Sequence, residues 1–347
     1  MATTNNRIYY ACQTVELNGP SGTDNTPENA AWDAIQGLQS VGINTNFNLE
    51  PIYQLGQLSL YDNYEEIPEV EISLNKVLDG YATIYSMAMG TGSLNSLANH
   101  RCGARLTLYP DTSTSATGNA LTSVEMLPAY LSSVTYNFPT EGNFTEEVTL
   151  VSNDKKWVSV GSPSNRAPAN TEPTGDAPTG FGIMRRGQLS LAGSLLPSGS
   201  GGIPDGMKYQ SISISMNLGR ESIYNLGQRT PFLRYVNFPV EITSEFEVIA
   251  NTGDMLGVDQ GSNACALSKA LVNKPIKIAT CDGMVIDLGT KNKVTSVNYQ
   301  GGDTGGGNAT ITYSFQTFND FTYTPPTGAN YFAADGIVEE DASFPLS

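Results

Sequence analysis

The stretch LQSVGINTNFNLEPIYQLGQ, residues 38–57, returns later in the chain as YQSISISMNLGRESIYNLGQ, residues 209–228. At this offset of 171 residues, ten of the twenty positions are identical without a gap. Ordinary composition would give on the order of one or two identities. The identical pairs are Gln39/Gln210, Ser40/Ser211, Ile43/Ile214, Asn46/Asn217, Glu50/Glu221, Ile52/Ile223, Tyr53/Tyr224, Leu55/Leu226, Gly56/Gly227 and Gln57/Gln228. The chain therefore contains an internal repeat.

The similarity extends well beyond these twenty residues. After Pro68 and Pro239, Val70–Ile72 matches Val240–Ile242 with a slip of one residue, as a β-bulge produces. Near the far ends, Ser133–Tyr136 matches Ser296–Tyr299. Two copies at so long a period indicate a duplicated globular unit rather than a solenoid. We predict a first copy at 1–158, a linker rich in Pro, Gly and Ser at 159–180, a second copy at 181–324 and an acidic tail at 325–347.

Composition and alternation predict an all-β fold. Charged residues make up 15% of the chain, which holds 35 Gly and 19 Pro, so short strands and many loops are favoured over helices. Apolar and small polar residues alternate over 41–48 and over 211–218, as in strands with one buried face. We expect further strands at 8–15, 69–74 and 183–192. One short helix per copy is expected, at 93–99 and 262–273, where Ser precedes Leu and Ala.

The sequence offers little for catalysis, metal binding or nucleic-acid capture. The net charge is -16, which opposes binding of phosphate or an anionic membrane. The single histidine, His100, fits the C-terminal end of a helix better than a catalytic role. The four cysteines lie far apart, without metal-site spacing. We therefore expect no enzyme activity, no cofactor, no metal and no membrane partner. We also expect synthesis in a cytoplasm, because residues 1–20 lack a signal-peptide pattern.

Two further tracts carry a resemblance to a known family. LSSVTYNFPTEGNFTEEVTLVSNDK, residues 131–155, resembles the strand, hairpin and strand that recur in tail tube proteins of tailed bacteriophages. EEIPEVEISLNKVLDG, residues 65–80, followed by 81–87, looks like the central hairpin of that family. The resemblance implies a β-sandwich domain flanked by a helix, whose long strands join those of its neighbours in an inner barrel. It also implies stacked rings of six domains, through which the genome passes.

With two copies per chain, we expect three chains to build each ring, with true threefold and pseudo-sixfold symmetry. Six chains with one copy outside the wall is the alternative. The other partners would be the tape measure and tail terminator proteins. The protein would be made in the host cytoplasm and located in the virion tail. Phage DNA would pass through the tube without specific binding. A different class, a carbohydrate-binding or adhesive β-sandwich of a tail tip, fibre or capsid surface, stays open.

Two sets of residues are candidates for functional contacts. A conduit for DNA should be neutral or acidic, and the polar strand faces supply such residues: Asn44, Asn46, Glu69, Glu71, Ser213, Ser215 and Glu241 are expected to line the lumen. The long connections 17–37 and 195–206 are expected to make the contacts between rings. Their apolar anchors would be Trp32, Ile35 and Leu38.

Overall fold

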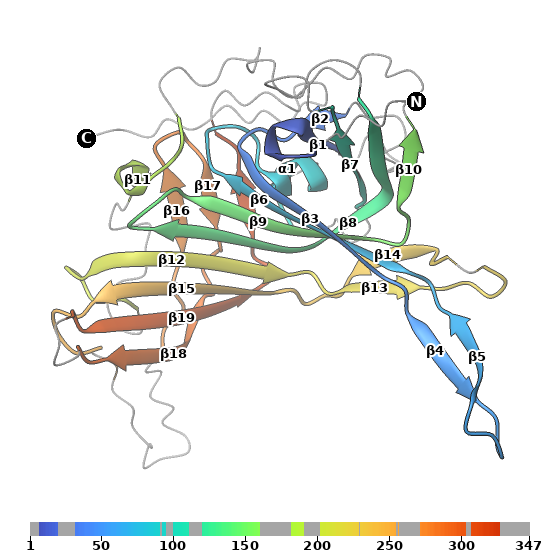
Figure 1. Cartoon of the computed structure of the whole chain (residues 1–347). Helices are drawn as coiled ribbons and strands as arrows, with labels where there is room; N and C mark the ends of the chain where they lie inside the picture. The colour runs from blue at the N-terminus through green and yellow to red at the C-terminus, as the bar shows by residue number, and fades with distance from the viewer. Residues whose placement is uncertain are drawn as a thin grey trace.

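The computed structural model describes residues 7–19, 32–90, 92–94, 100–110, 120–159, 182–190, 202–228, 230–254, 256, 271–302 and 307–326. More than half of these residues lie in strands and few lie in helices, which confirms the all-β class (Figure 1). Residues 160–180 of the predicted linker and most of the predicted tail lie outside the described residues, as does most of the helix expected at 262–273.

A long row of antiparallel strands within the 12-stranded sheet organises the molecule. Its order is β3-β6-β9-β8-β12-β15-β19-β18, each strand pairing with the next. The bounds are β3 (Leu38–Asn46), β6 (Glu69–Val77), β9 (Thr145–Ser152), β8 (Thr122–Pro139), β12 (Lys208–Asn217), β15 (Glu241–Ile249), β19 (Thr310–Phe318) and β18 (Lys293–Gln300). Strands from both predicted copies thus share one sheet. We call residues 1–158 the N-half and 181–324 the C-half.

The two halves place their strands in matching order and with matching irregularities. The first register shift lies between Leu38 and Ser40 in the N-half, and between Tyr209 and Ser211 in the C-half. The second separates Leu131 from Ser133 and, in the C-half, Val294 from Ser296. The same sequence offsets relate both pairs of bulges, 171 residues for the first and 163 for the second.

The pairing corrects one detail of the repeat alignment. Asn44 pairs with Glu71 in the N-half, and Ser215 pairs with Thr243 in the C-half. Since Asn44 and Ser215 are 171 residues apart, Glu71 corresponds to Thr243 by register, and Glu69 to Glu241. The slip after Pro68 therefore runs in the opposite direction from the predicted one, but it keeps the same face because the two registers differ by two residues.

Shorter strands complete the fold. In the N-half, β1 (Gln13–Asn18), β2 (Asp33–Ala34), β7 (Cys102–Leu108) and β10 (Lys156–Ser159) extend the 12-stranded sheet beyond the row. In the C-half, β11 (Leu189–Ser190), β16 (Lys277–Thr280), β17 (Val285–Asp287) and β20 (Thr322–Thr324) form a four-stranded sheet. Two expected strands begin later than predicted, because 3-10 turns at Tyr10–Cys12 and Arg186–Gln188 precede β1 and β11.

The described helix, α1 (Ile84–Met89), lies before the position expected from the sequence. Thr83 caps its first turn by accepting from the Ser86 backbone N–H, and Gly90 ends it in the left-handed region. In the expected helix at 93–99, Ser93 instead bridges to Thr322, and residues 95–99 lie outside the described part. Segment 81–87, compared with a family hairpin, is thus largely helical. Over the described residues, no helix is long and apolar enough to cross a membrane.

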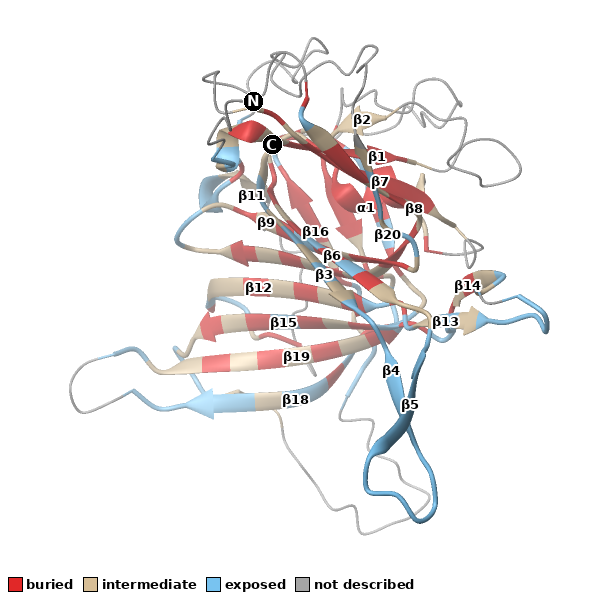
Figure 2. Ribbon diagram, turned by 45° about the vertical axis from the view of Figure 1, so that its right-hand side comes forward, coloured by how far each residue is buried: buried red, intermediate tan, exposed pale blue. Residues whose placement is uncertain are grey.

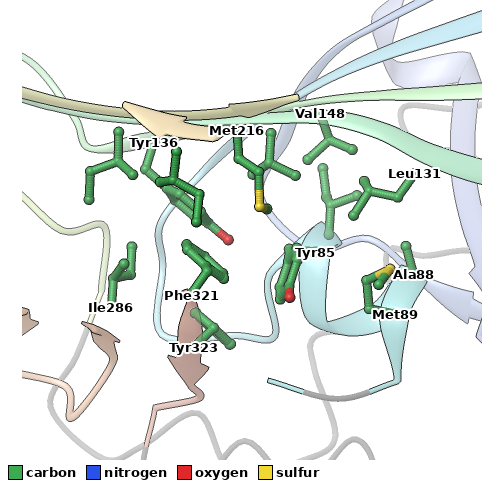
Figure 3. Close-up of a cluster of buried hydrophobic side chains, with 14 of the residues drawn as sticks. Tyr85, Ala88, Met89, Leu131, Tyr136, Val148, Met216, Ile286, Phe321 and Tyr323 are labelled. Carbon is green, nitrogen blue, oxygen red and sulfur yellow. The ribbon is translucent and has the colours of Figure 1, made fainter. Parts of the chain in front are cut away.

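One hydrophobic core serves both halves (Figure 3). Tyr136 of β8 stacks on Phe321, just before β20, with ring centroids 6.4 Å apart. Tyr85 of α1 meets the same Phe321 edge-on at 5.1 Å. Gly92 is required at this contact, because a Cβ there would overlap the carbonyl oxygen of Tyr323. The halves are therefore packed together rather than strung on a linker.

Two hairpins leave the row at the same end. The N-arm, residues 47–68, contains β4 (Leu49–Tyr53) and β5 (Leu60–Glu65), and the C-arm, residues 218–239, contains β13 (Arg220–Ile223) and β14 (Leu233–Val236). Figure 1 shows β4 and β5 projecting away from the body, whereas β13 and β14 lie beside it. Every residue of β4 and β5 is exposed (Figure 2).

Candidate assembly surfaces

The seven residues expected to line a lumen lie on a single face of the row. Directly paired residues of adjacent strands share a face, and so do residues two apart along a strand. On the first two strands, Asn46 pairs with Glu69 and Asn44 with Glu71. Glu147 of β9 continues the face, because it pairs with Asn75 of β6 and with Thr135 of β8. Ser215 pairs with both Thr135 and Thr243, and Ser213 pairs with Asn137. Glu241 lies two residues before Thr243 on the same face. The structure thus brings together residues that are separated by up to ~200 positions in the chain.

This polar face is predominantly acidic. Its acidic residues are Glu69, Glu71, Glu147, Glu241, Glu245 and Glu247, and its lysines are Lys208 and Lys293, each at the start of its strand. Between them lie serines, threonines and asparagines that hydrogen-bond across strands, such as Ser213 to Asn137 at 3.1 Å. The opposite face supplies the core, with Ile72, Val134 and Ile214 each almost fully buried. The face therefore offers a polar, mostly negative surface.

The two halves meet at a strand pairing. β8, the last strand of the N-half in row order, pairs with β12, the first of the C-half, from Ser211↔Pro139 to Asn217↔Ser133. Among the described residues, β3 pairs only with β6 and β18 only with β19. These strands end the row on its two sides and expose backbone groups that can pair with another strand.

The C-arm is held against the N-half by two arginines. Arg220 donates from Nε to the carbonyl oxygen of Leu131 at 2.6 Å, and its guanidinium lies 5.7 Å from the ring centre of Tyr130. Burial lowers the pKa of Arg220 to about 10. Arg234 makes a 3.0 Å ion pair with Glu69. Glu69 thus differs from the other predicted lumen residues, because the C-arm engages it.

The N-arm has the same internal pairing as the C-arm but different surroundings. Leu49 pairs with Glu65 and Glu50 with Tyr64, at the positions where the C-arm pairs Arg220 with Val236 and Glu221 with Tyr235. Large apolar side chains cover the N-arm and are exposed: Leu49, Ile52, Tyr53, Leu55, Leu58, Leu60, Tyr61 and Tyr64. Exposed apolar surface of this kind marks an interaction site. Strand periodicity does not predict this surface, although the repeat alignment contains the Leu49/Arg220 difference.

The three residues expected to contact a neighbouring ring have different environments. Trp32 is half-buried, and the guanidinium of Arg105 lies 4.4 Å from its ring centre. Ile35 is 5% exposed and belongs to the core, on which Leu38 also packs. Trp32 and Leu38 therefore keep surface for an external contact, whereas Ile35 anchors the segment in its own chain. Residues 20–31 and 191–201 of the two connections lie outside the described residues.

His100 and the cysteines fit structural roles. His100 Nδ1 lies 2.6 Å from the carbonyl oxygen of Met89, the last residue of α1, so it caps a helix as expected, although a different helix. Burial lowers its pKa. Cys12 and Cys102 are buried free thiols, Cys281 is exposed, and Cys265 lies outside the described residues. Over the described part of the chain, no three His, Cys, Asp or Glu side chains cluster as a metal site would.

No protein-family model and no curated protein matches the chain. Solved structures similar to it include a chain of the PVC sheath–tube complex of an extracellular contractile injection system, at 16% identity and a TM-score of 0.33, covering 45% of this chain and 95% of that one. A chain of the anti-feeding prophage baseplate is 12% identical with a TM-score of 0.33, and the match covers 47% of this chain and 100% of that one. A chain of the anti-feeding prophage cap is 15% identical with a TM-score of 0.31, and the match covers 46% of this chain and 99% of that one.

Proposed function

We propose that this protein is a structural virion protein whose chains join edge to edge into rings, and that these rings stack into a phage tail tube. The observation that carries the proposal is the β8–β12 junction. It joins the last strand of one half to the first strand of the next, and the same two kinds of strand, β18 and β3, are left at the ends of the row. A junction that repeats head to tail closes into a ring when its rotation allows.

The intrachain junction predicts the register between chains. The repeat offsets convert Ser215↔Thr135 into Asn44↔Asn298, with Asn44 on one chain and Asn298 on the next. The faces then agree, because Ile43 would pair with Tyr299, in place of the buried pair Ile214 and Tyr136. Tyr299 is 56% exposed in the single chain, and this pairing would cover it.

Three chains per ring is the proposed stoichiometry, with each chain providing two duplicated tail-tube-like units. Both halves contribute strands to one continuous row, which favours a wall built from both over the alternative in which six chains carry one half outside. The polar face would line the lumen, where its acidic and neutral side chains offer DNA no cationic contacts along most of each strand. DNA would then slide through during ejection without being bound.

Contacts beyond the ring complete the proposal. Connections 17–37 and 195–206, with Trp32 and Leu38 as surface anchors, would meet the next ring. The tape measure and tail terminator proteins would bind inside and at the end of the tube. These partners follow from the tail tube assignment. The competing function, a carbohydrate-binding or adhesive module, requires neither paired edges nor a ring.

Disulfide trapping tests both the junction and the number of chains. In a background with Cys265 and Cys281 replaced by serine, Asn44→Cys with Asn298→Cys should cross-link under mild oxidation, since paired residues have Cα atoms ~5 Å apart. We expect covalent trimers and nothing larger on denaturing gels, and threefold rings by electron microscopy. Asn44→Cys with Ser296→Cys, two residues out of register, is the control. A ladder reaching hexamer would contradict three chains, and a monomer retained on a glycan matrix would favour the adhesive module.

A further inference from the structure

We infer that the N-arm of each chain docks on the C-half of the next chain in the ring through an ion pair between Glu65 and Lys293. The C-arm docks on its own N-half with the opposite arrangement of charge. This inference rests on the proposed ring and concerns what fixes the order of halves around it. The arm would carry a positive charge at the junction within a chain and a negative charge at the junction between chains. This difference would require N-halves and C-halves to alternate around the ring.

The docked C-arm shows where the N-arm would bind. Its Arg220 sits beside Tyr130, which pairs with Val151 just before the second bulge of β8. The equivalent residue of the C-half is Lys293, which pairs with Gln316 just before the matching bulge of β18. Lys293 is exposed in the single chain. The docking position occupied within the chain is therefore open at the outer edge of the row.

The charged residue of this pair lies on opposite strands of the two arms and has opposite charge. In the C-arm, Arg220 faces Val236 across the hairpin; Arg220 is half-buried and Val236 is buried. In the N-arm, the same two positions hold Leu49 and Glu65. Where the C-arm presents a cation to Tyr130, the N-arm presents an apolar side chain and a carboxylate. Opposite Lys293, Leu49 can cover the aliphatic stem while Glu65 meets the ammonium group.

A second contact changes in a compatible way. Arg234 of the C-arm pairs with Glu69, and the equivalent positions are Asn63 and Glu241. An Asn63 side-chain amide can donate to the Glu241 carboxylate, which now accepts from Gln316 Nε2 at 2.6 Å. The N-arm therefore keeps a donor for this carboxylate although it loses the positive charge.

The net charges of the arms agree with this arrangement. Residues 47–68 contain four acidic residues and no Lys or Arg, whereas residues 218–239 contain three Arg and one Glu. A C-arm at the C-half position would set Arg220 against Lys293, and an N-arm at the N-half position would set Asn63 in place of Arg234 beside Glu69, which would lose its cation. Like charges at a contact disfavour the wrong partner. Reversed charge at the two junctions would thus select alternating halves.

Charge exchange tests the ion pair directly. Lys293→Glu and Glu65→Lys should each raise the concentration needed for ring assembly at least about tenfold, and the double variant should return to within about threefold of wild type. Lys208→Glu makes the same charge change on the same face at the far end of β12 and should assemble as wild type. Assembly is measured by light scattering after size exclusion, and thermal unfolding checks that each variant folds.

The outcomes separate this inference from the proposed function. If wild type and Lys208→Glu form rings but Lys293→Glu assembles equally well, or if the double variant is no better than either single variant, the ion pair is wrong and the ring stands. If wild type and Lys208→Glu stay monomeric at every concentration and Asn44→Cys with Asn298→Cys fails to cross-link, the proposed function itself fails.

Discussion

At the scale of single residues, the halves differ in charge at one buried pair of positions. Lys76 and Glu146 pair across β6 and β9 and are fully buried, whereas the C-half has Val248 and Ile311 at the same register. The Glu146 carboxylate accepts from the backbone N–H groups of the first two residues of α1, at 2.6 and 2.9 Å. The helix therefore explains why a carboxylate is buried here, because Glu146 accepts from N–H groups that have no partner within the first turn of α1. Burial raises its pKa despite these bonds.

Removing this carboxylate should be costly. Glu146→Ala leaves two buried N–H donors and the Tyr136 hydroxyl without their acceptor, whereas Lys76 keeps its ion pair with Asp79. We expect the free energy of unfolding to fall by about 3 kcal/mol or more, measured by urea denaturation. The neighbouring Glu147→Ala, on the exposed face, should cost less than about 1 kcal/mol. A loss at Glu146 as small as that at Glu147 would refute the capping role.

At the scale of elements, the sequence predicted what alternation and repetition encode. The strands at 38–46 and 208–217 were predictable because one face is apolar and the other small and polar. Helix α1 was not predicted, since the carboxylate that accepts from its first two N–H groups belongs to Glu146, about 60 residues away. The seven lumen candidates were found by period, but the arms were missed because contacts with another surface leave no periodic pattern.

The docking of the C-arm should depend on Arg220. Arg220→Ala removes the hydrogen bond to the Leu131 carbonyl and the contact with the Tyr130 ring, so the C-arm should detach while the row stays intact. We expect faster cleavage within 218–239 by limited proteolysis and a loss of about 1–3 kcal/mol in unfolding free energy. Leu49→Ala, at the equivalent but exposed position of the N-arm, is the matched control. Unchanged cleavage in Arg220→Ala would show that other contacts hold the arm.

At the scale of the whole molecule, a single chain is an unfinished sheet. Over the described residues, its two end strands each pair on one side alone, and long exposed edges favour association with other strands. Pairing β18 with β3 of the next chain would remove both edges and bring the polar faces of all chains onto one side. In the proposed tube, the acidic residues of that face would serve a purpose, because a conduit for a polyanion must not bind it.

That purpose can be tested by reversing charge on the polar face. Glu71→Lys with Glu245→Lys places two cations per chain on exposed positions away from the arm contacts, so rings and tubes should still form. Each lysine that reaches a phosphate adds affinity that falls with salt, so these tubes should retain short duplex DNA at low ionic strength and release it at high ionic strength. Glu141→Lys with Asp154→Lys, at exposed positions between strands, carries the same net charge outside the strands. If both kinds of tube retain DNA equally, or neither does, then Glu71 and Glu245 do not face the lumen and the conduit must be lined by another surface.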